Sequence, residues 1–288
     1  MRIAAIIPTH RRPALLRDAI SSVLRQTRLP EELIVVDDVG DLQTAQIVLS
    51  QVGRAPLALR YVHNSRCPGA CASRNLGALL SSGDWFAFLD DDDVWRDNFV
   101  ERAAARAAER DVGLVMTGIV RQVQGLADTP RFTPEGLTAE TVLDHRSSMT
   151  GSNLLIAADA FSTVRGFDPA MTVFNDWDFL VRAIRAGIPY AVVGEPLAEW
   201  REHGGERIAT PSLARAAGIE AFLARYEREL PGWMRRELRT TALGIRRKHA
   251  TAAAPYLGLS IRLALALGPR AALSRIWSRH SNDRSVPT

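Results

Sequence analysis

The stretch WFAFLDDDDVW, residues 85–95, decides the fold of this 288-residue chain more than any other. Its first five residues are aromatic or aliphatic and uncharged, which predicts a buried strand. Four consecutive aspartates, Asp90 to Asp93, then end that strand. Carboxylates this close raise one another's pKa and oppose folding unless a cation sits among them. Because oxygen ligands suit Mg²⁺ or Mn²⁺, the pattern favours a divalent metal site, and the alternative is a solvated acidic turn.

Strands and amphipathic helices alternate on the N-terminal side of this stretch. The apolar runs Ile3–Ile7 and Leu33–Val36 each precede polar residues, and a helix opening at Cys71 leads into the Trp85 strand. This alternation predicts an α/β fold with a mostly parallel, Rossmann-like sheet and helices on both faces. Ligands bind outside the carboxyl ends of such strands. We therefore expect Thr9, Asp38 and the aspartates to lie on one edge of the sheet.

Composition limits the class of protein. Hydrophobic residues make up 47% of the chain, enough for one large domain plus an appendage. No uncharged apolar run approaches the ~20 residues of a membrane span, and no N-terminal signal pattern is present. We expect a cytoplasmic protein. The two cysteines, Cys67 and Cys71, fit a reducing compartment and are better fillers of a loop-to-helix turn than a zinc pair.

Charge is concentrated at the C-terminal end. The chain carries 36 basic and 32 acidic residues, of which 11 and 2 lie from Arg235 onward, so this end has a net charge of 11 − 2 = +9. Apolar residues at 256–267 are interrupted by Arg262. Such basic amphipathic segments can make a peripheral contact with the inner face of the cell membrane. The alternative is a packed helical appendage. Nucleic acid is not expected as a partner, because the basic excess is local and its aromatics are sparse.

Six segments together carry a resemblance to a known family. They are IIPTHRRPALL, ELIVVDD, GACASRNLGALLSSGDWFAFLDDDDVW, GFDP, NDWDFLVR and WREH. In this order they resemble glycosyltransferase family 2, the inverting enzymes of GT-A fold. The resemblance implies a GT-A catalytic domain over residues 1–205 and leaves 206–288 as a helical, basic, amphipathic C-terminal region.

The implied reaction moves a sugar from a nucleoside diphosphate-sugar to an acceptor hydroxyl with inversion. UDP- or dTDP-sugars are the favoured donors. The acceptor implied is a bacterial glycan, lipid-linked or not, or a small molecule. Two other interpretations stay open: a nucleotidyltransferase, although no glycine- and lysine-rich phosphate loop follows the first strand, and a catalytically retired nucleotide-sugar-binding protein.

The resemblance also assigns the donor site. Asp92 is the implied direct ligand of Mg²⁺ or Mn²⁺, Asp90 or Asp91 faces ribose or metal-bound water, and Asp93 has a structural role. The positions implied to hold the nucleotide-sugar outside the aspartates are Pro8, Thr9, Arg11, Asp38, Arg74 and Arg201. The family usually continues Asp-Asp-Gly-Ser after its second strand. This chain has Asp37-Asp38-Val39-Gly40 instead, which leaves the base preference open.

The segment NDWDFL, residues 175–180, resembles the family's Glu-Asp-x-x-Leu motif and places Asp176 as the general base. Asn175 replaces the usual glutamate, so Asp176 has less upward pKa pressure from like charge. The alternative is that Asp176 only caps a helix. In the WREH element, Arg201 is implied to add positive charge at the diphosphate, and His203 to complete the metal site. We expect residues 126–149 to form a polar loop over the site.

Overall fold

The computed structural model describes residues 1–122, 129–144, 148–201 and 210–267. The chain forms two compact units. The first contains Met1–Ala170 and Asn175–Gly205, and the second contains Met171–Phe174 and Glu206–Thr288.

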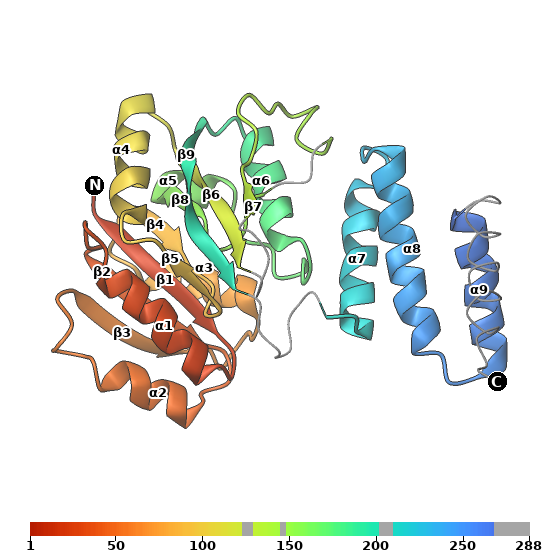
Figure 1. Cartoon of the computed structure of the whole chain (residues 1–288), viewed down its shortest axis with the longest axis horizontal. Helices are drawn as coiled ribbons and strands as arrows, with labels where there is room; N and C mark the ends of the chain where they lie inside the picture. The colour runs from red at the N-terminus through yellow and green to blue at the C-terminus, as the bar shows by residue number, and fades with distance from the viewer. Residues whose placement is uncertain (123–128, 145–147, 202–209, 268–288) are drawn as a thin grey trace, which may run out of the picture. The chain divides into compact units, whose positions relative to one another are not determined.

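The first unit is built on a mixed sheet, to which the described residues contribute nine strands (Figure 1). The strands are β1 (Ile3–Thr9), β2 (Glu32–Asp37), β3 (Ala58–His63), β4 (Trp85–Phe88), β5 (Asp93–Trp95), β6 (Leu114–Gln122), β7 (Thr129–Arg131), β8 (Leu154–Ala157) and β9 (Tyr190–Arg201). Their order is β3-β2-β1-β4-β8-β6-β9-β5, and β7 pairs with β6. The sequence therefore predicted the α/β class correctly.

Parallel pairing brings the candidate residues to one edge of the sheet. β1 runs parallel to both β2 and β4, with Thr9 opposite Asp37 and Ile6 opposite Phe88. The polar residues after β1, β2 and β4 thus emerge at the same edge, as the alternating pattern predicts. The second half of the sheet is mixed, because β8 runs antiparallel to β4 and β6 while β9 runs parallel to β6.

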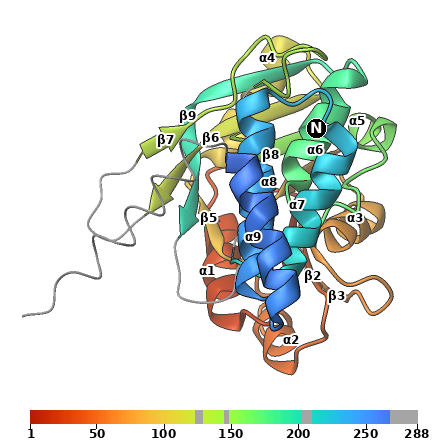
Figure 2. The same ribbon diagram turned by 90° about the vertical axis from the view of Figure 1, so that its right-hand side faces the viewer.

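Helices cover both faces of this sheet (Figures 1 and 2). The helices of the first unit are α1 (Pro13–Leu24), α2 (Leu42–Leu49), α3 (Ala70–Leu80), α4 (Phe99–Arg110), α5 (Ala158–Thr163) and α6 (Asn175–Arg185). Helices α1 and α4 share a buried core with alternate residues of β1, such as Ile3 and Ile7. Helix α3 packs against the other face, where Gly77 permits close approach: an added Cβ would lie 2.5 Å from Ile6 Cγ2.

The second unit contains α7 (Leu213–Tyr226), α8 (Gly232–Lys248) and α9 (Ala253–Leu267). Helix α7 packs on α8, and α8 packs on α9. Ser212 caps α7, because its side chain accepts a hydrogen bond from the Arg215 N–H. Among the described helices, none combines the length and the apolar character that crossing a bilayer requires.

Candidate active site

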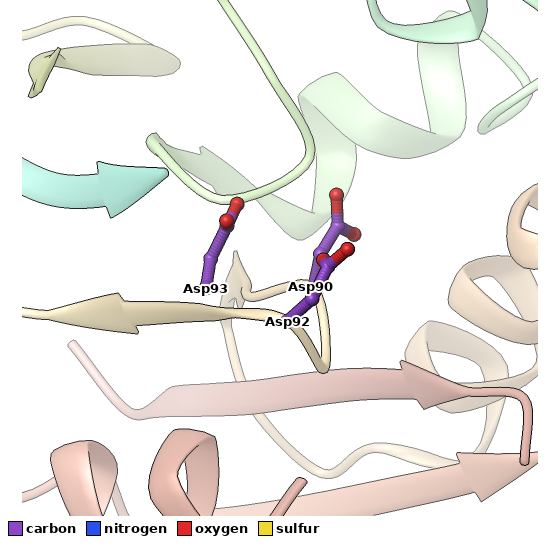
Figure 3. Close-up of side chains that lie close together, drawn as sticks. All are labelled: Asp90, Asp92 and Asp93. Carbon is purple, nitrogen blue, oxygen red and sulfur yellow. The ribbon is translucent and has the colours of Figure 1, made fainter. Parts of the chain in front are cut away.

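The aspartates after β4 form the centre of the site. Asp90, Asp92 and Asp93 each place a carboxylate oxygen so that the three atoms lie within 4.8 Å of one another. Figure 3 shows the three side chains on the same side of the loop. Within the described parts of the chain, these three residues are the group of carboxylates that could hold a metal ion.

Asp91 is engaged elsewhere, at the end of β1. Its Oδ2 accepts hydrogen bonds from Thr9 Oγ1 at 2.8 Å and from the His10 N–H at 3.2 Å. The side chain is buried, and burial raises the pKa of Asp91 to about 6, against the lowering effect of the Arg12 guanidinium. Of the two residues expected to face ribose or metal-bound water, Asp90 therefore belongs to the cluster, and Asp91 fastens the aspartate loop to Thr9.

Two arginines neutralise part of the charge of this loop. Arg12 Nη1 lies 3.0 Å from both Asp91 Oδ1 and Asp92 Oδ2. Arg74 forms an ion pair with Asp90. Guanidinium groups therefore supply part of the positive charge that four adjacent carboxylates require. Sequence reasoning missed Arg12, because its partners lie 79 and 80 residues further along the chain.

Asp93 carries the feature that fits a metal ion best. It is 3% exposed, and its Oδ2 accepts a hydrogen bond from Ser152 Oγ. Its Oδ1 is buried and has no hydrogen-bond partner. Burial first, and then the charges of Asp90 and Asp92, raise its pKa well above the usual range. A buried carboxylate oxygen without a donor, beside two further carboxylates, is the donor set that Mg²⁺ or Mn²⁺ prefers.

The loop before β8 contacts the aspartates through Ser152 and Gly151. Ser152 Oγ accepts a hydrogen bond from the Asp90 N–H at 3.1 Å, and its carbonyl accepts one from Trp95 Nε1 at 2.7 Å. Gly151 has no room for a side chain, since an added Cβ would collide with the Arg74 guanidinium and lie 2.8 Å from Asp90 Oδ1. Both residues therefore fix the position of the loop.

Arg74 is a buried link between the metal loop and helix α6. It is 3% exposed. Besides the Asp90 pair, its Nη1 donates to Asn175 Oδ1 at 3.3 Å, and its guanidinium lies 5.0 Å from the centre of the Phe167 ring. Its neighbour Asn75 exchanges two hydrogen bonds with the Phe167 backbone, of 2.7 and 2.9 Å. Asn175, at the position of the family's glutamate, is thus a neutral acceptor for Arg74.

Asp176 lies in the first turn of α6, one residue inside the helix. Its Oδ1 accepts a hydrogen bond from the Trp177 N–H at 2.8 Å. Burial raises the pKa of Asp176 to about 6, although Trp177 N–H and Arg74 act in the opposite direction. A carboxylate with a pKa near neutrality is suited to take a proton from a hydroxyl. Asp178 is instead fully buried and paired with Arg182 at 2.8 Å.

The remaining donor-site candidates of β1 and β2 lie at the same edge. Asp38 Oδ1 lies 2.6 Å from His10 Nδ1, and its Oδ2 accepts from the Gly69 N–H, before α3, at 2.9 Å. Pro8 is buried within β1, while Arg11 is exposed and has a φ of +52°. His10 is a second residue that sequence reasoning missed.

Arg201 is the last residue of β9, and its side chain contacts the backbone of the aspartate loop. Its Nε donates to the Asp92 carbonyl at 3.1 Å, and its Nη1 lies 2.7 Å from Asp18 Oδ2 on α1. His203 lies outside the described residues. In the expected loop 126–149, Val142, Leu143 and Met149 are buried, whereas most of the other described residues of this stretch are exposed.

The chain is similar to known proteins in sequence and in fold. The family model "Glycosyl transferase family 2" matches residues 4–164. An uncharacterized glycosyltransferase of Haemophilus influenzae is 26% identical over 202 residues, which cover 68% of this chain and 66%, just under two thirds, of that protein.

Two solved structures share the fold at 17% sequence identity. Staphylococcus aureus TarS 1–349 in complex with UDP-GlcNAc has a TM-score of 0.63 and covers 93% of this chain and 77% of that chain. The mannosyltransferase PcManGT of Pyrobaculum calidifontis, in complex with GDP-Man and Mn²⁺, has a TM-score of 0.60 and covers 96% and 83%. The fold is thus of the GT-A type.

Proposed function

Because this chain belongs to glycosyltransferase family 2, we propose that it is an inverting, metal-dependent enzyme that uses a UDP- or dTDP-sugar. The single observation that carries the proposal is the link made by Arg74. This buried residue joins Asp90 of the carboxylate cluster to Asn175, the neighbour of Asp176. One charged side chain therefore connects the group that suits a diphosphate-bound cation with the group that suits a general base.

In this proposal Asp92, with Asp90 and Asp93, holds Mg²⁺ or Mn²⁺. The ion supplies Lewis-acid neutralisation of the charge that develops on the leaving diphosphate. The orphaned Asp93 oxygen supports a wider ligand set than the sequence implied. His203 stays a further candidate ligand. The side chains of Arg201 and Arg12 contact the aspartate loop and add positive charge beside it.

The proposed chemistry at the acceptor belongs to Asp176. Its carboxylate takes the proton of the acceptor hydroxyl as that oxygen attacks the anomeric carbon from the face opposite the diphosphate. The new C–O bond forms, the bond from the sugar to the diphosphate oxygen breaks, and the nucleoside diphosphate leaves with the electron pair. The acceptor hydroxyl has a pKa far above neutrality, so a positioned base speeds this step by about 10²–10⁴-fold.

The nucleotide would lie along the ends of β1 and β2. Pro8, Thr9, Arg11 and Asp38 occupy this edge, and the proposal keeps them as donor-site residues. Arg74 would act on the donor indirectly, by holding Asp90, because its guanidinium is buried and already paired. The two structural neighbours were solved with UDP-GlcNAc and with GDP-Man, so their likeness supports nucleotide-sugar chemistry and does not choose the base.

The acceptor side includes a proposed contact with an anionic lipid surface through α9. Leu257, Ile261 and Leu265 repeat every four residues on this helix and are 62%, 53% and 78% exposed. Leu263, about the opposite side of the helix, is buried where α9 packs on α8. An outward apolar stripe is unfavourable in water. The net charge of +9 from Arg235 onward would repel a second copy and attract anionic lipid, which supports a lipid-linked acceptor.

The proposed function is tested by a panel of nucleotide-sugars. UDP-, dTDP- and GDP-sugars are incubated with the full chain, with and without Mn²⁺, and release of the nucleoside diphosphate is measured. We expect Mn²⁺-dependent release from one donor class. Tight nucleotide binding with no turnover of any donor would favour the catalytically retired protein, and release of pyrophosphate from a nucleoside triphosphate would favour the nucleotidyltransferase.

A further inference from the structure

Four residues just before the candidate base belong to the C-terminal helical unit. Met171–Phe174 cluster with residues 206–288, whereas Ala170 before them and Asn175 after them belong to the first unit. Asp176, the candidate base, is the second residue after this segment. The second unit therefore includes the segment of chain that leads directly into α6.

Helix α7 holds this segment by close packing. Gly218 lies against it, and an added Cβ there would be 2.5 Å from Val173 Cγ2 and 2.7 Å from Thr172 Oγ1. The Phe174 ring meets the buried Phe222 ring edge-on, with 5.2 Å between the ring centres. Met171 and Val173 are 3% and 4% exposed. Gly218 and Phe222 of α7 thus form the surface on which residues 172–174 pack.

The residue that directly precedes α6 belongs to this packed segment. This residue is Phe174, whose side chain cannot accept a hydrogen bond from the N–H groups of the first turn. Its φ of +58° is in the left-handed region, which a bulky aromatic residue adopts only when its surroundings hold it. Packing on Phe222 is one such restraint.

We propose that α7 of the C-terminal unit is a positioning element for the base. By holding Thr172–Phe174, Gly218 and Phe222 fix where α6 begins, and so fix the aim of the Asp176 carboxylate. The catalytic part of this inference rests on the proposed function of Asp176, and the structural part does not. On this account the helical unit sets the geometry of catalysis in addition to any lipid contact that it makes.

The structural part is tested with two matched glycine substitutions in the full-length protein. Gly218→Ala and Gly244→Ala both replace a helical glycine of the second unit, so both raise helix propensity equally. An alanine Cβ would collide with the segment at Gly218, whereas nothing lies within 4 Å of one at Gly244. Amide hydrogen exchange is followed in peptides covering Phe179–Ile184, whose N–H groups bond to carbonyls of the first turns of α6.

We expect Gly218→Ala to speed exchange in these α6 peptides at least about tenfold, and Gly244→Ala to leave it unchanged. Thr172→Ala and Val173→Ala added together to Gly218→Ala should restore protection, because they remove the two side-chain atoms that the new Cβ meets most closely. Phe222→Leu is a second variant that loses the edge-on ring contact and keeps an apolar side chain. Unchanged exchange in α6 in both Gly218→Ala and Phe222→Leu would overturn the proposal.

The catalytic readout uses the donor found in the nucleotide-sugar panel. Gly218→Ala should lower kcat at least about tenfold with donor KM and Mn²⁺-dependent UDP affinity nearly unchanged, and adding Thr172→Ala with Val173→Ala should recover kcat. A loss confined to donor KM, or a kcat equal to wild type, would contradict the positioning role. If no donor turns over, the proposed function fails, while the exchange measurement still decides whether α7 holds the start of α6.

Discussion

At the scale of single residues, the aspartate loop shows how a protein tolerates four adjacent carboxylates. Each has a different environment: Asp91 is bound by Thr9, His10 and Arg12, and Asp90 is paired with Arg74. Asp92 shares Arg12, and Asp93 keeps one buried oxygen without a partner. The sequence indicated the need for a cation and the metal chemistry that follows. It could not assign the arginines, because ion pairs across 79 or 16 residues leave no periodic signal.

The proposed role of Asp176 predicts a specific kinetic defect. Asp176→Asn keeps the size of the side chain and removes the proton acceptor. We expect kcat to fall by at least about 10²-fold, with donor KM and UDP affinity nearly unchanged, because a base acts in the transition state only. Steady-state kinetics with the donor found in the panel measure this. A defect of similar size in donor KM alone would place Asp176 in the donor site instead.

The pH dependence of the reaction should report the same carboxylate. Burial raises the pKa of Asp176 to about 6. Only the deprotonated form accepts a proton, so kcat should be constant above pH 7 and fall as pH is lowered through about 6, close to tenfold per pH unit. The profile is measured at saturating donor and Mn²⁺ from pH 5 to 8. A kcat that does not change over this range would exclude a titrating base of this kind.

At the scale of helices and strands, hydrophobic patterns predicted individual elements well. β1, β2 and β4 each contain an uninterrupted apolar run, and α1 and α6 carry apolar residues at helical spacing, so each element could be predicted by itself. The mixed half of the sheet was not predicted, because a short buried run such as β8 carries no information about its partner or direction. The contact of α3 with α6 through Arg74 could not be predicted either, because a side-chain contact between residues far apart in the sequence leaves no periodic pattern.

Arg74 predicts how strongly α3 is tied to the aspartate loop. Arg74→Met leaves Asp90, whose side chain is 29% exposed, without its cation, and we expect a loss of stability between that of a surface pair and the about 3–5 kcal/mol of a fully buried pair. Arg2→Met is the matched control, because Arg2 pairs with Asp84 at the surface, where both side chains are more than half exposed, and the expected cost is about 0–1 kcal/mol. Urea denaturation followed by tryptophan fluorescence compares the two. Equal losses of stability would show that the Arg74 pair contributes no more than a surface pair.

At the scale of the whole molecule, the C-terminal unit raises the question of which surface α9 meets. Periodicity could indicate an amphipathic helix, but it could not tell which face packs on α8. The structure shows that the stripe of Leu257, Ile261 and Leu265 faces outward. The sequence predicted a helical, basic C-terminal region. It did not predict that Met171–Phe174 belong to the same unit, because four residues carry no compositional signal.

The lipid contact predicts binding to anionic vesicles. Full-length protein should co-sediment with vesicles that contain phosphatidylglycerol at low salt, and only in part at high salt, because each basic residue near the surface contributes about 1 kcal/mol, screened by ions. The double variant Ile261→Glu, Leu265→Glu should stay in the supernatant. Leu42→Glu, at an exposed leucine of α2, is the control that should bind like wild type. Wild-type protein in the supernatant at low salt would instead favour a soluble acceptor.

The most direct test of the central claim is a calorimetric titration of UDP into the wild-type protein, Asp92→Asn and Asp176→Asn, each with and without Mn²⁺. It requires no knowledge of the sugar or the acceptor. If the aspartate loop holds the ion that neutralises the diphosphate, wild type and Asp176→Asn bind UDP alike and only with Mn²⁺, and Asp92→Asn loses this binding while remaining folded. Binding of UDP to Asp92→Asn with unchanged Mn²⁺ dependence would contradict the account.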